Sequence, residues 1–176
     1  MKRVLSCFCL VLVTACTTSK SPTNVIAPLK PITLDQKLKI IAGQTVYVPI
    51  YSHIFMWDQS RTMDLTATLS VRNTDLTQSI IIASVNYYNN RGQLVRKYLQ
   101  QPVELGALSS TDFVVNQDDS SGGSGAAFVV EWVSQYNVAI PVIESVMINT
   151  SGNQGVSFVS AGRVIKQRAN PNNPLQ

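Results

Sequence analysis

The stretch Leu65–Asn73, which reads LTATLSVRN, decides the fold class of this chain. Apolar side chains alternate with polar ones along it, and successive side chains of a β-strand point to opposite faces of the sheet. One face of the strand is therefore apolar and the other polar. This pattern is typical of an antiparallel sheet that packs its inner face on a second layer and exposes its outer face to water.

Other runs with strand character recur at short intervals, with turn residues between them. No run of useful length shows the period of an amphipathic helix. The spacing therefore predicts one all-β domain over residues 44–167, an antiparallel immunoglobulin-like β-sandwich of about 7–9 strands. Further strands are expected at Thr45–Tyr51, Ser79–Tyr88, Leu94–Leu99, Val103–Leu105, Ser110–Val115, Ala126–Val133, Val142–Asn149 and Gly155–Ile165, with Leu69, Val71, Val85, Val130 and Trp132 in the core.

Some residues predict local details of these strands. Pro49 has no backbone N–H, which points to the edge of a sheet. The apolar run Ile80–Ile82 predicts burial on both faces or a bulge, and Asn89–Gly92 predicts a hairpin turn with its glycine at positive φ. Gly43 is expected to break the chain, and Leu34–Ile41 forms either a first edge strand or more of the preceding linker.

The N-terminus has the pattern of a secretory signal. Lys2 and Arg3 precede the uncharged run Val4–Val13, which at ~1.5 Å per residue is too short to cross a bilayer core of ~30 Å as a helix. The sequence Val-Thr-Ala-Cys that ends at Cys16 resembles the lipobox of bacterial lipoproteins. That resemblance implies cleavage after the small residue Ala15 and a diacylglyceryl group on the Cys16 sulfur. The alternative is an ordinary signal peptide with an incidental cysteine.

The segments around the domain follow from this pattern. Residues 1–15 are predicted to be a cleaved lipoprotein signal peptide, and residues 16–43 a lipidated N-terminus with a flexible, proline-punctuated tether. Residues 168–176 are predicted to be a disordered tail. The residue after the lipidated cysteine is Thr17 rather than an aspartate, which in a Gram-negative cell favours the periplasmic face of the outer membrane. We expect the protein in the cell envelope, anchored to membrane lipid through Cys16.

The composition after cleavage bounds the function. Loss of Lys2 and Arg3 leaves 12 basic residues of the original 14 against 10 acidic ones, a net charge of +2. The basic residues are scattered, so no nucleic-acid partner is expected. Cys7 and Cys9 leave with the signal and Cys16 becomes a thioether, so no thiol remains for pairing, metal binding or catalysis.

Four residues after the first predicted strand are candidates for a binding patch: Tyr51, His53, Trp57 and Asp58. The alternative is that a long loop, residues 52–62, tucks these aromatic rings onto the end of the sandwich. His53 is the only histidine, and a zinc site needs about four ligands, so no metal and no cofactor are expected.

The second candidate loop is Asp118–Gly125, a flexible acidic turn without a core-forming residue. Its adjacent acids could suit calcium, but a solvated turn is the better interpretation because the acids do not alternate. Ser124 stands in a sequence similar to a nucleophile elbow, with Ala126 where that motif has glycine and His53 as the one available base. A serine hydrolase is therefore the less favoured hypothesis.

The segments Val46–Ile54, Leu65–Asp75, Ser120–Ala126 and Gly155–Ser160 together resemble a bacterial family catalogued as domain of unknown function 3124. The resemblance covers nearly all of residues 44–165. It implies an envelope lipoprotein with a β-sandwich, and it implies no activity and no catalytic residue.

We therefore expect a membrane-anchored bacterial lipoprotein that serves as a non-catalytic interaction or structural module of the envelope, with an envelope protein or a glycan as partner. The alternative is an envelope hydrolase or an enzyme that processes a small ligand. The supply of catalytic groups separates the two hypotheses. One histidine, no thiol and scattered carboxylates favour the non-catalytic module.

Overall fold

The computed structural model describes residues 29–34, 38–151 and 155–168, and within these ranges the chain is all-β with antiparallel sheets. The predicted signal peptide, Cys16, most of the tether and nearly all of the C-terminal tail lie outside the described residues. Within the described ranges, no helix is long and apolar enough to cross a membrane.

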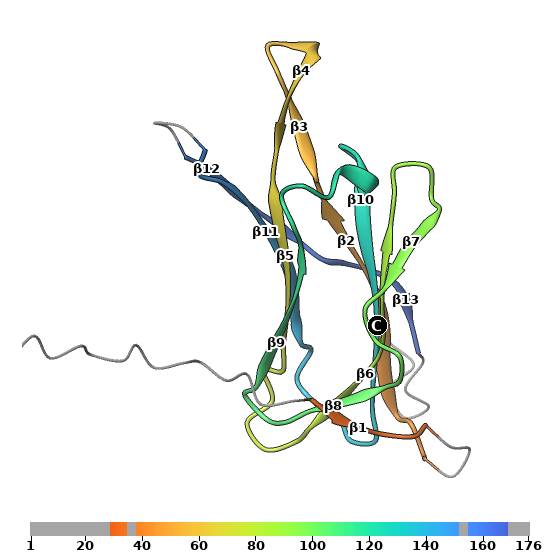
Figure 1. The fold of residues 1–176 in the computed structure, drawn as a ribbon. Coiled ribbons are helices and arrows are strands. Elements are labelled where there is room, and N and C mark those ends of the chain that lie inside the picture. Colours follow the sequence, from red (N-terminus) through yellow and green to blue (C-terminus); the bar gives the residue numbers. More distant parts are fainter. Residues whose placement is uncertain (1–28, 35–37, 152–154, 169–176) are drawn as a thin grey trace, which may run out of the picture.

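Two large sheets and one small one contain the strands (Figure 1). The seven-stranded sheet has the order β1-β8-β6-β10-β2-β13, with β7 paired to β6. The four-stranded sheet has the order β12-β11-β5-β9, and β3 pairs with β4 in a separate hairpin. The strands are β1 (Lys30–Pro31), β2 (Ala42–Ile50), β3 (His53–Met56), β4 (Asp58–Asp64), β5 (Thr66–Arg72), β6 (Ile80–Tyr88), β7 (Leu94–Lys97), β8 (Val103–Leu105), β9 (Ser110–Val115), β10 (Ala126–Ser134), β11 (Val142–Asn149), β12 (Val156–Ala161) and β13 (Arg163–Gln167).

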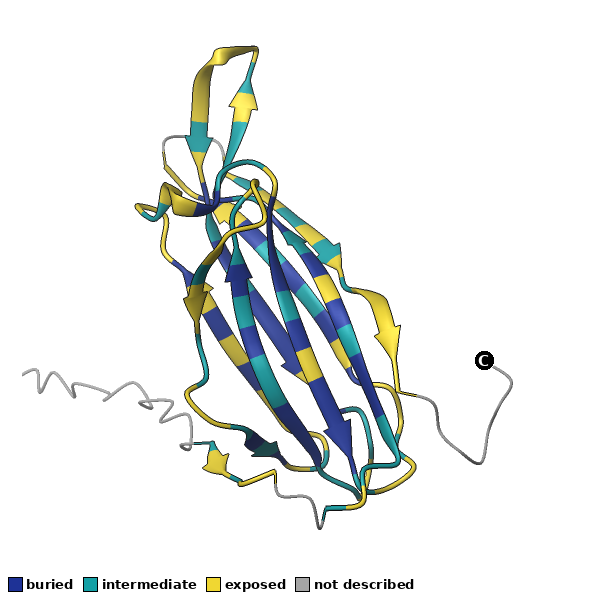
Figure 2. Ribbon diagram, turned by 90° about the vertical axis from the view of Figure 1, so that its right-hand side faces the viewer, coloured by how far each residue is buried: buried dark blue, intermediate teal, exposed yellow. Residues whose placement is uncertain are grey.

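The stretch that predicted the fold is β5, an inner strand of the four-stranded sheet. It pairs with β11 on one side and β9 on the other, and Ala67, Leu69 and Val71 on its inner face are fully buried. The five core residues expected from the sequence are all buried, and they belong to one cluster to which both large sheets contribute (Figure 2). At ~25 cal/mol per Å², this shared burial is the main stabilising term of the fold.

The predictions made from Pro49 and Gly43 are both wrong, because both residues lie within the inner strand β2. This strand pairs with β10 over its whole length and with β13 over its first part, so it is not an edge strand as Pro49 suggested. Its pairing with β13 ends at Tyr47, however, so Pro49 lies where no donor is needed on that side. Gly43 does not break the chain but lies within β2, where a Cβ would meet the Trp132 carbonyl oxygen at 2.7 Å.

The predicted strand Gly155–Ile165 is two strands that belong to different sheets. β12 pairs with β11 in the four-stranded sheet, and β13 pairs with β2 in the seven-stranded sheet. Gly162 lies between them, donates its N–H to the Ile143 carbonyl at 2.9 Å, and has no room for a side chain because a Cβ would lie 2.6 Å from that oxygen. The chain thus changes sheets at a bend, as strands do at the corners of packed sheets.

The thirteen strands of the described residues exceed the predicted number of about 7–9. The split at Gly162, the β3–β4 hairpin and the short strand β1 account for the difference. Two local predictions are confirmed: Ile80–Ile82 is buried throughout beside a register shift, and Gly92 closes its turn with φ of +73°.

The predicted tether contains ordered chain. β1 pairs with β8, and Lys30 forms an ion pair of 3.0 Å with Glu104 of that strand. Of the two alternatives for Leu34–Ile41, the first edge strand is not present among its described residues, and the short strand β1 lies upstream of it. β1 and β8 lie at the end of the domain opposite the β3–β4 hairpin (Figure 1).

Candidate functional site: the projecting hairpin

Residues 52–62 were expected to form a loop, and the structure shows instead that most of them belong to the β3–β4 hairpin. Ile54 and Met63 pair across it and pack against the edge of the core, which fixes the direction of the hairpin. β4 reads DQSRTMD and has a single apolar residue, so it lacks the alternating pattern that would predict a strand. His53 and Asp58 therefore lie on paired strands, and Trp57 lies at the turn between them.

The hairpin has an inner and an outer face. Because side chains alternate, the pairs His53–Asp64 and Phe55–Thr62 lie on the face opposite to Ile54 and Met63. The His53 and Phe55 rings meet edge to face with centroids 5.8 Å apart, and Phe55 is 52% exposed. The outer face thus presents two aromatic rings beside an acidic residue.

Trp57 lies at the tip, between the two strands, and is 87% exposed. Its φ of +60° is in the left-handed region, which costs a bulky L-residue roughly 1–2 kcal/mol. The guanidinium carbon of Arg61 lies 5.3 Å from the centroid of the indole ring. The alternative that the Trp57 ring packs onto the end of the domain is therefore wrong, and a residue at positive φ holds a large aromatic ring in solvent.

Asp58 organises the tip next to this tryptophan. Its carboxylate accepts hydrogen bonds from the backbone N–H of Ser60 at 2.8 Å and from the Ser60 hydroxyl at 2.6 Å. These bonds lower the pKa of Asp58, so the group is ionised at neutral pH. The carboxylate closes an Asx-type turn and leaves a negative charge beside Trp57.

Tyr51 does not belong with the other three candidates. It is partly buried against the core, and its ring meets Phe158 edge to face with centroids 5.7 Å apart. The structure therefore brings His53, Trp57 and Asp58 together on the hairpin and places Tyr51 below it. For Tyr51 the packing alternative is the better description.

Hydrogen bonds fix the root of the hairpin to the body of the domain. The Ser52 hydroxyl donates to the Gly123 carbonyl oxygen at 3.0 Å, and the Leu65 N–H donates to the Ser52 carbonyl at 2.8 Å. On the other side, the Asn149 side-chain amide donates to the Asp64 carbonyl oxygen. Both strands of the hairpin are thus tied to the domain where they leave it.

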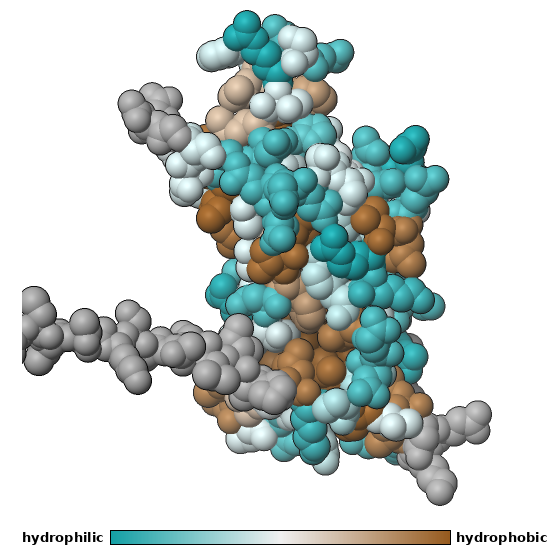
Figure 3. Space-filling model, in the orientation of Figure 1, coloured by the Kyte–Doolittle hydropathy of each residue, from teal (hydrophilic) through white to brown (hydrophobic). Residues whose placement is uncertain are grey.

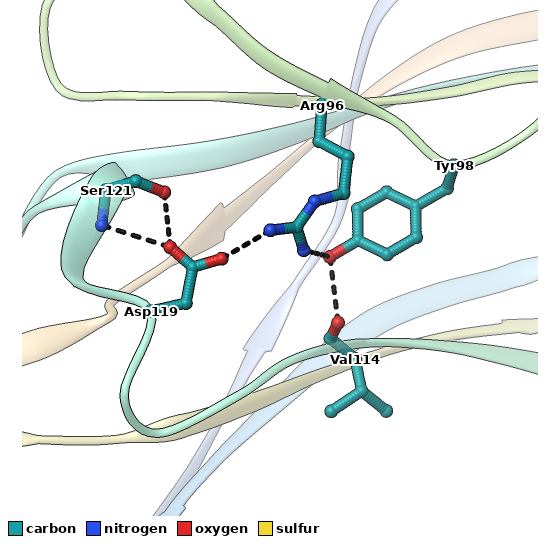
Figure 4. A network of polar contacts seen from close by, with 5 residues as sticks. All are labelled: Arg96, Tyr98, Val114, Asp119 and Ser121. Atoms are coloured by element: carbon teal, nitrogen blue, oxygen red, sulfur yellow. Dashed lines mark hydrogen bonds and ion pairs between the residues drawn. The ribbon is translucent and has the colours of Figure 1, made fainter.

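The loop that holds Ser52 is the predicted acidic turn, and half of its residues are exposed, as expected. Ion-pair and hydrogen-bond contacts hold it in place, however, which corrects the prediction that it is flexible (Figure 4). Asp119 forms an ion pair of 2.7 Å with Arg96 of β7. It also caps the short 3-10 turn Ser120–Gly122, because its carboxylate accepts hydrogen bonds from the backbone N–H and the hydroxyl of Ser121. Arg96 also donates to the Tyr98 hydroxyl at 3.0 Å, and that hydroxyl donates to the Val114 carbonyl at 2.8 Å. Partial burial raises the pKa of Asp119, but the Ser121 and Arg96 contacts lower it by more.

Gly122 explains the course of this loop. It is buried against Tyr87, and a Cβ there would lie 1.9 Å from the Tyr87 hydroxyl oxygen, so only glycine fits. The Tyr87 hydroxyl is buried and has no hydrogen-bond partner of good geometry among the described residues, and burial raises its pKa. No residue of the loop, which the structure describes in full, belongs to the hydrophobic core, as predicted, but the backbone at Gly122 is buried against the domain.

The hairpin presents exposed aromatic and charged side chains. Within residues 29–34, 38–151 and 155–168, no hydrogen bond joins His53 to Ser124, and no three His, Cys, Asp or Glu side chains gather as metal ligands. A cavity of about 350 Å³ is lined by Glu131, Lys166 and Arg168 among others, and His53 does not line it. The sequence analysis did not identify Arg61 or Arg96 as part of the site. Arg61 could have been proposed as a neighbour of Trp57, because it lies only four residues further along the chain.

Comparisons with known proteins identify the family of this chain. A search of curated proteins finds no match. A solved structure described as "Crystal Structure of Thermotoga maritima 1070" resembles this chain with a TM-score of 0.41 at 9% identity, over 68% of this chain and 92% of that one. A family sequence model matches residues 43–165, most of the described domain. The chain belongs to the family described as "Protein of unknown function (DUF3124)".

Proposed function

We propose that this chain is a membrane-anchored bacterial envelope lipoprotein and that it acts as a non-catalytic interaction module. Residues 1–15 are its signal peptide, Cys16 carries the lipid, and the domain is an immunoglobulin-like sandwich that presents the β3–β4 hairpin to a partner. The protein resides in the cell envelope, on the periplasmic face of the outer membrane in a Gram-negative cell.

The anchor is supported by the order of signals at the N-terminus. A basic start, an uncharged run, Ala15 and Cys16 follow one another directly, as lipidation requires. Two or three acyl chains on Cys16 would hold the protein stably at a membrane, whereas a single chain binds only marginally.

The single observation that carries the interaction role is the exposure of Trp57 at the tip of an anchored hairpin. Tryptophan is enriched at binding hot spots because its ring buries a large area with few rotatable bonds. Here the ring is 87% exposed, and hydrogen bonds at Ser52 and Asp64 fix the root of the element that carries it. A side chain with no packing role in the domain is free to contact a partner.

The enzyme hypothesis has less support. A serine hydrolase needs a nucleophile bonded to a base and a third group that orients the base. The one histidine, His53, lies on the exposed hairpin beside Phe55, and among the described residues no hydrogen bond joins it to Ser124.

Two experiments test the two parts of the proposal. Cys16→Ser should remove the protein from the membrane fraction and abolish incorporation of labelled palmitate. If the variant still carries label and fractionates with membranes, the anchor is wrong. The tagged, lipidated full-length protein should capture a partner from detergent-solubilised envelope, and Trp57→Ala should abolish that capture.

Leu76→Ala is the matched control, because Leu76 is a 76% exposed apolar residue in the turn after β5, away from the hairpin. The proposal requires capture by the control at the wild-type level. Equal capture by Trp57→Ala and wild type would remove the hairpin from the interaction, and equal loss in both variants would show that capture follows general surface hydrophobicity.

A further inference from the structure

We propose that the partner of the hairpin is a polysaccharide of the cell wall, whose sugar rings stack on Trp57. This inference rests on the proposed function and names the class of partner. Its basis is the chemistry around the exposed ring, the small size of the element that carries it, and the position of the hairpin relative to β1.

The tip of the hairpin is too hydrophilic to enter a lipid bilayer. β4 is exposed along nearly its whole length and carries Asp58, Arg61 and Asp64, and the tip is predominantly hydrophilic in the space-filling view (Figure 3). A charged side chain within a bilayer costs several kcal/mol. Most of the apolar residues of the hairpin lie on β3, before Trp57, but the charged residues of β4 pair alongside them and would have to enter the bilayer with the ring.

The tip is also too small to hold a folded protein by itself. A stable protein interface buries about 800 Å² and roughly 20–30 residues on each side. β3 and β4 contain 4 and 7 residues, and one face of them, with Ile54 and Met63, already packs against the core. A narrow, repetitive ligand matches the size of this surface better.

A saccharide matches the chemistry of the site. The C–H groups on one face of a pyranose ring pack on an indole, and its hydroxyls need hydrogen-bond partners beside that indole. Arg61 lies near the Trp57 ring, and the carboxylate of Asp58 is fixed next to it by Ser60. The second exposed ring, Phe55, lies along the same hairpin and provides a further stacking surface for a neighbouring sugar.

The position of the hairpin supports a partner away from the anchoring membrane. β1, the first described strand after the lipid site, lies at the opposite end of the domain from the hairpin (Figure 1). At ~3.3 Å per residue, the chain from Ala42 to Trp57 spans at most about 50 Å. The chain between Cys16 and Lys30 adds at most about 48 Å when fully extended. The chain from the lipid site enters the domain at β1, at the opposite end from the tip, which allows the domain to present the tip away from the membrane.

The test uses the lipidated full-length protein in detergent micelles, sedimented with purified peptidoglycan sacculi. The wild type and Leu76→Ala should co-sediment, Trp57→Ala should bind at least ten-fold less, and soluble glycan strands freed of their peptides should displace the wild type. Absence of co-sedimentation, full binding by Trp57→Ala, or failure of peptide-free strands to compete would each overturn the assignment.

Tryptophan fluorescence gives a second readout, because Trp132 is buried and Trp57 is the exposed one of the two tryptophans. In vesicles of phosphatidylcholine and phosphatidylglycerol that hold the lipidated protein, the emission of Trp57 should shift to the blue only when peptide-free glycan is added. A blue shift in the vesicles alone would show insertion into lipid and overturn the assignment.

The two proposals fail in different ways. If the sacculi do not bind but the capture of an envelope protein is still lost in Trp57→Ala, the glycan assignment fails and the hairpin remains the contact. If Trp57→Ala changes neither measurement, both proposals fail.

Discussion

The backbone N–H and the hydroxyl of Ser52 both donate to the carbonyl oxygen of Gly123, at 3.2 and 3.0 Å. Ser52 is fully buried, so these bonds are shielded from competing water. They join two segments that are far apart in the sequence, the root of the hairpin and the loop that Asp119 holds against Arg96. The candidate binding element and the acidic loop are therefore one structural unit.

The first prediction concerns this unit. Asp119→Asn removes the ion pair with Arg96 and weakens the cap on the turn Ser120–Gly122. Both contacts are partly exposed, so the free energy of unfolding should fall by only about 1 kcal/mol. The amide protons of Ser52 and Leu65 should nevertheless exchange faster, because their acceptors belong to the loosened unit. Hydrogen exchange measures this.

Asp118→Asn is the matched control for that experiment, since Asp118 is the adjacent acid and the Arg96 ion pair is made by Asp119. Identical exchange at Ser52 in wild type and Asp119→Asn would mean that the loop does not support the hairpin.

A second prediction separates function from stability at the tip. Trp57→Gly removes the indole and places a residue without a Cβ at a φ of +60°, which glycine adopts without strain. The melting temperature should therefore stay equal or rise slightly, even though the contact with Arg61 is lost. A clear drop in melting temperature, measured by circular dichroism, would show that Trp57 stabilises the fold and would weaken its assignment to a binding site.

A third prediction concerns pH. The backbone N–H groups of Thr77, Ala139 and Gln78 donate to the Asp75 carboxylate and lower its pKa to about 2. A carboxyl whose pKa is lower in the folded state stabilises the fold above its unfolded pKa of ~3.9, and that contribution is lost as the pH falls toward 2. Asp75→Asn should therefore melt at a lower temperature than wild type at pH 7, and the difference should shrink between about pH 4 and pH 2.

Asp112→Asn, on the exposed face of β9, is the control and should follow the wild-type curve. A difference between Asp75→Asn and wild type that stays constant down to pH 2 would show that the Asp75 charge does not contribute.

The fourth prediction tests the core that both sheets share. Leu69 is fully buried in β5, so Leu69→Ala should lower the free energy of unfolding by about 2–5 kcal/mol through lost burial and a residual cavity. Chemical denaturation measures this, with Thr68→Ala on the opposite face of the same strand as the control. A loss below ~1 kcal/mol would mean that β5 does not face a packed core.

The sequence predicted those elements whose side chains follow the period of a strand. β5 alternates clearly, and the core residues predicted in β5 and β10 are buried. β10 is buried on parts of both faces, so Ala127 and Val133 are buried as well and were not predicted to be in the core. β4 has no apolar face, so its sequence did not indicate a strand. Its pairing with β3 and the hydrogen bonds at Ser52 and Asp64 hold it in place instead. The change of sheet at Gly162 is likewise a tertiary effect, since the residues on either side of it read as one continuous strand.

The candidate site was predicted in part. The exposed Trp57 was identified by residue type, but its place at the tip of a hairpin depends on pairing that the local sequence does not specify. The ion pair between Arg96 and Asp119 joins positions 23 residues apart, and no local pattern indicates it. Tyr51 was grouped with the site by sequence proximity, although the chain between Tyr51 and His53 leads from the core onto the hairpin.

The central claim is that the tip of the hairpin contacts a partner in the envelope of the living cell. The most direct measurement places a photo-cross-linking amino acid at position 57 of the lipidated full-length protein, and at the exposed position 76 for comparison. We expect a discrete adduct, with wall glycan or with an envelope protein, from position 57 and none from position 76. No adduct at position 57, or the same adducts from both positions, would contradict the claim.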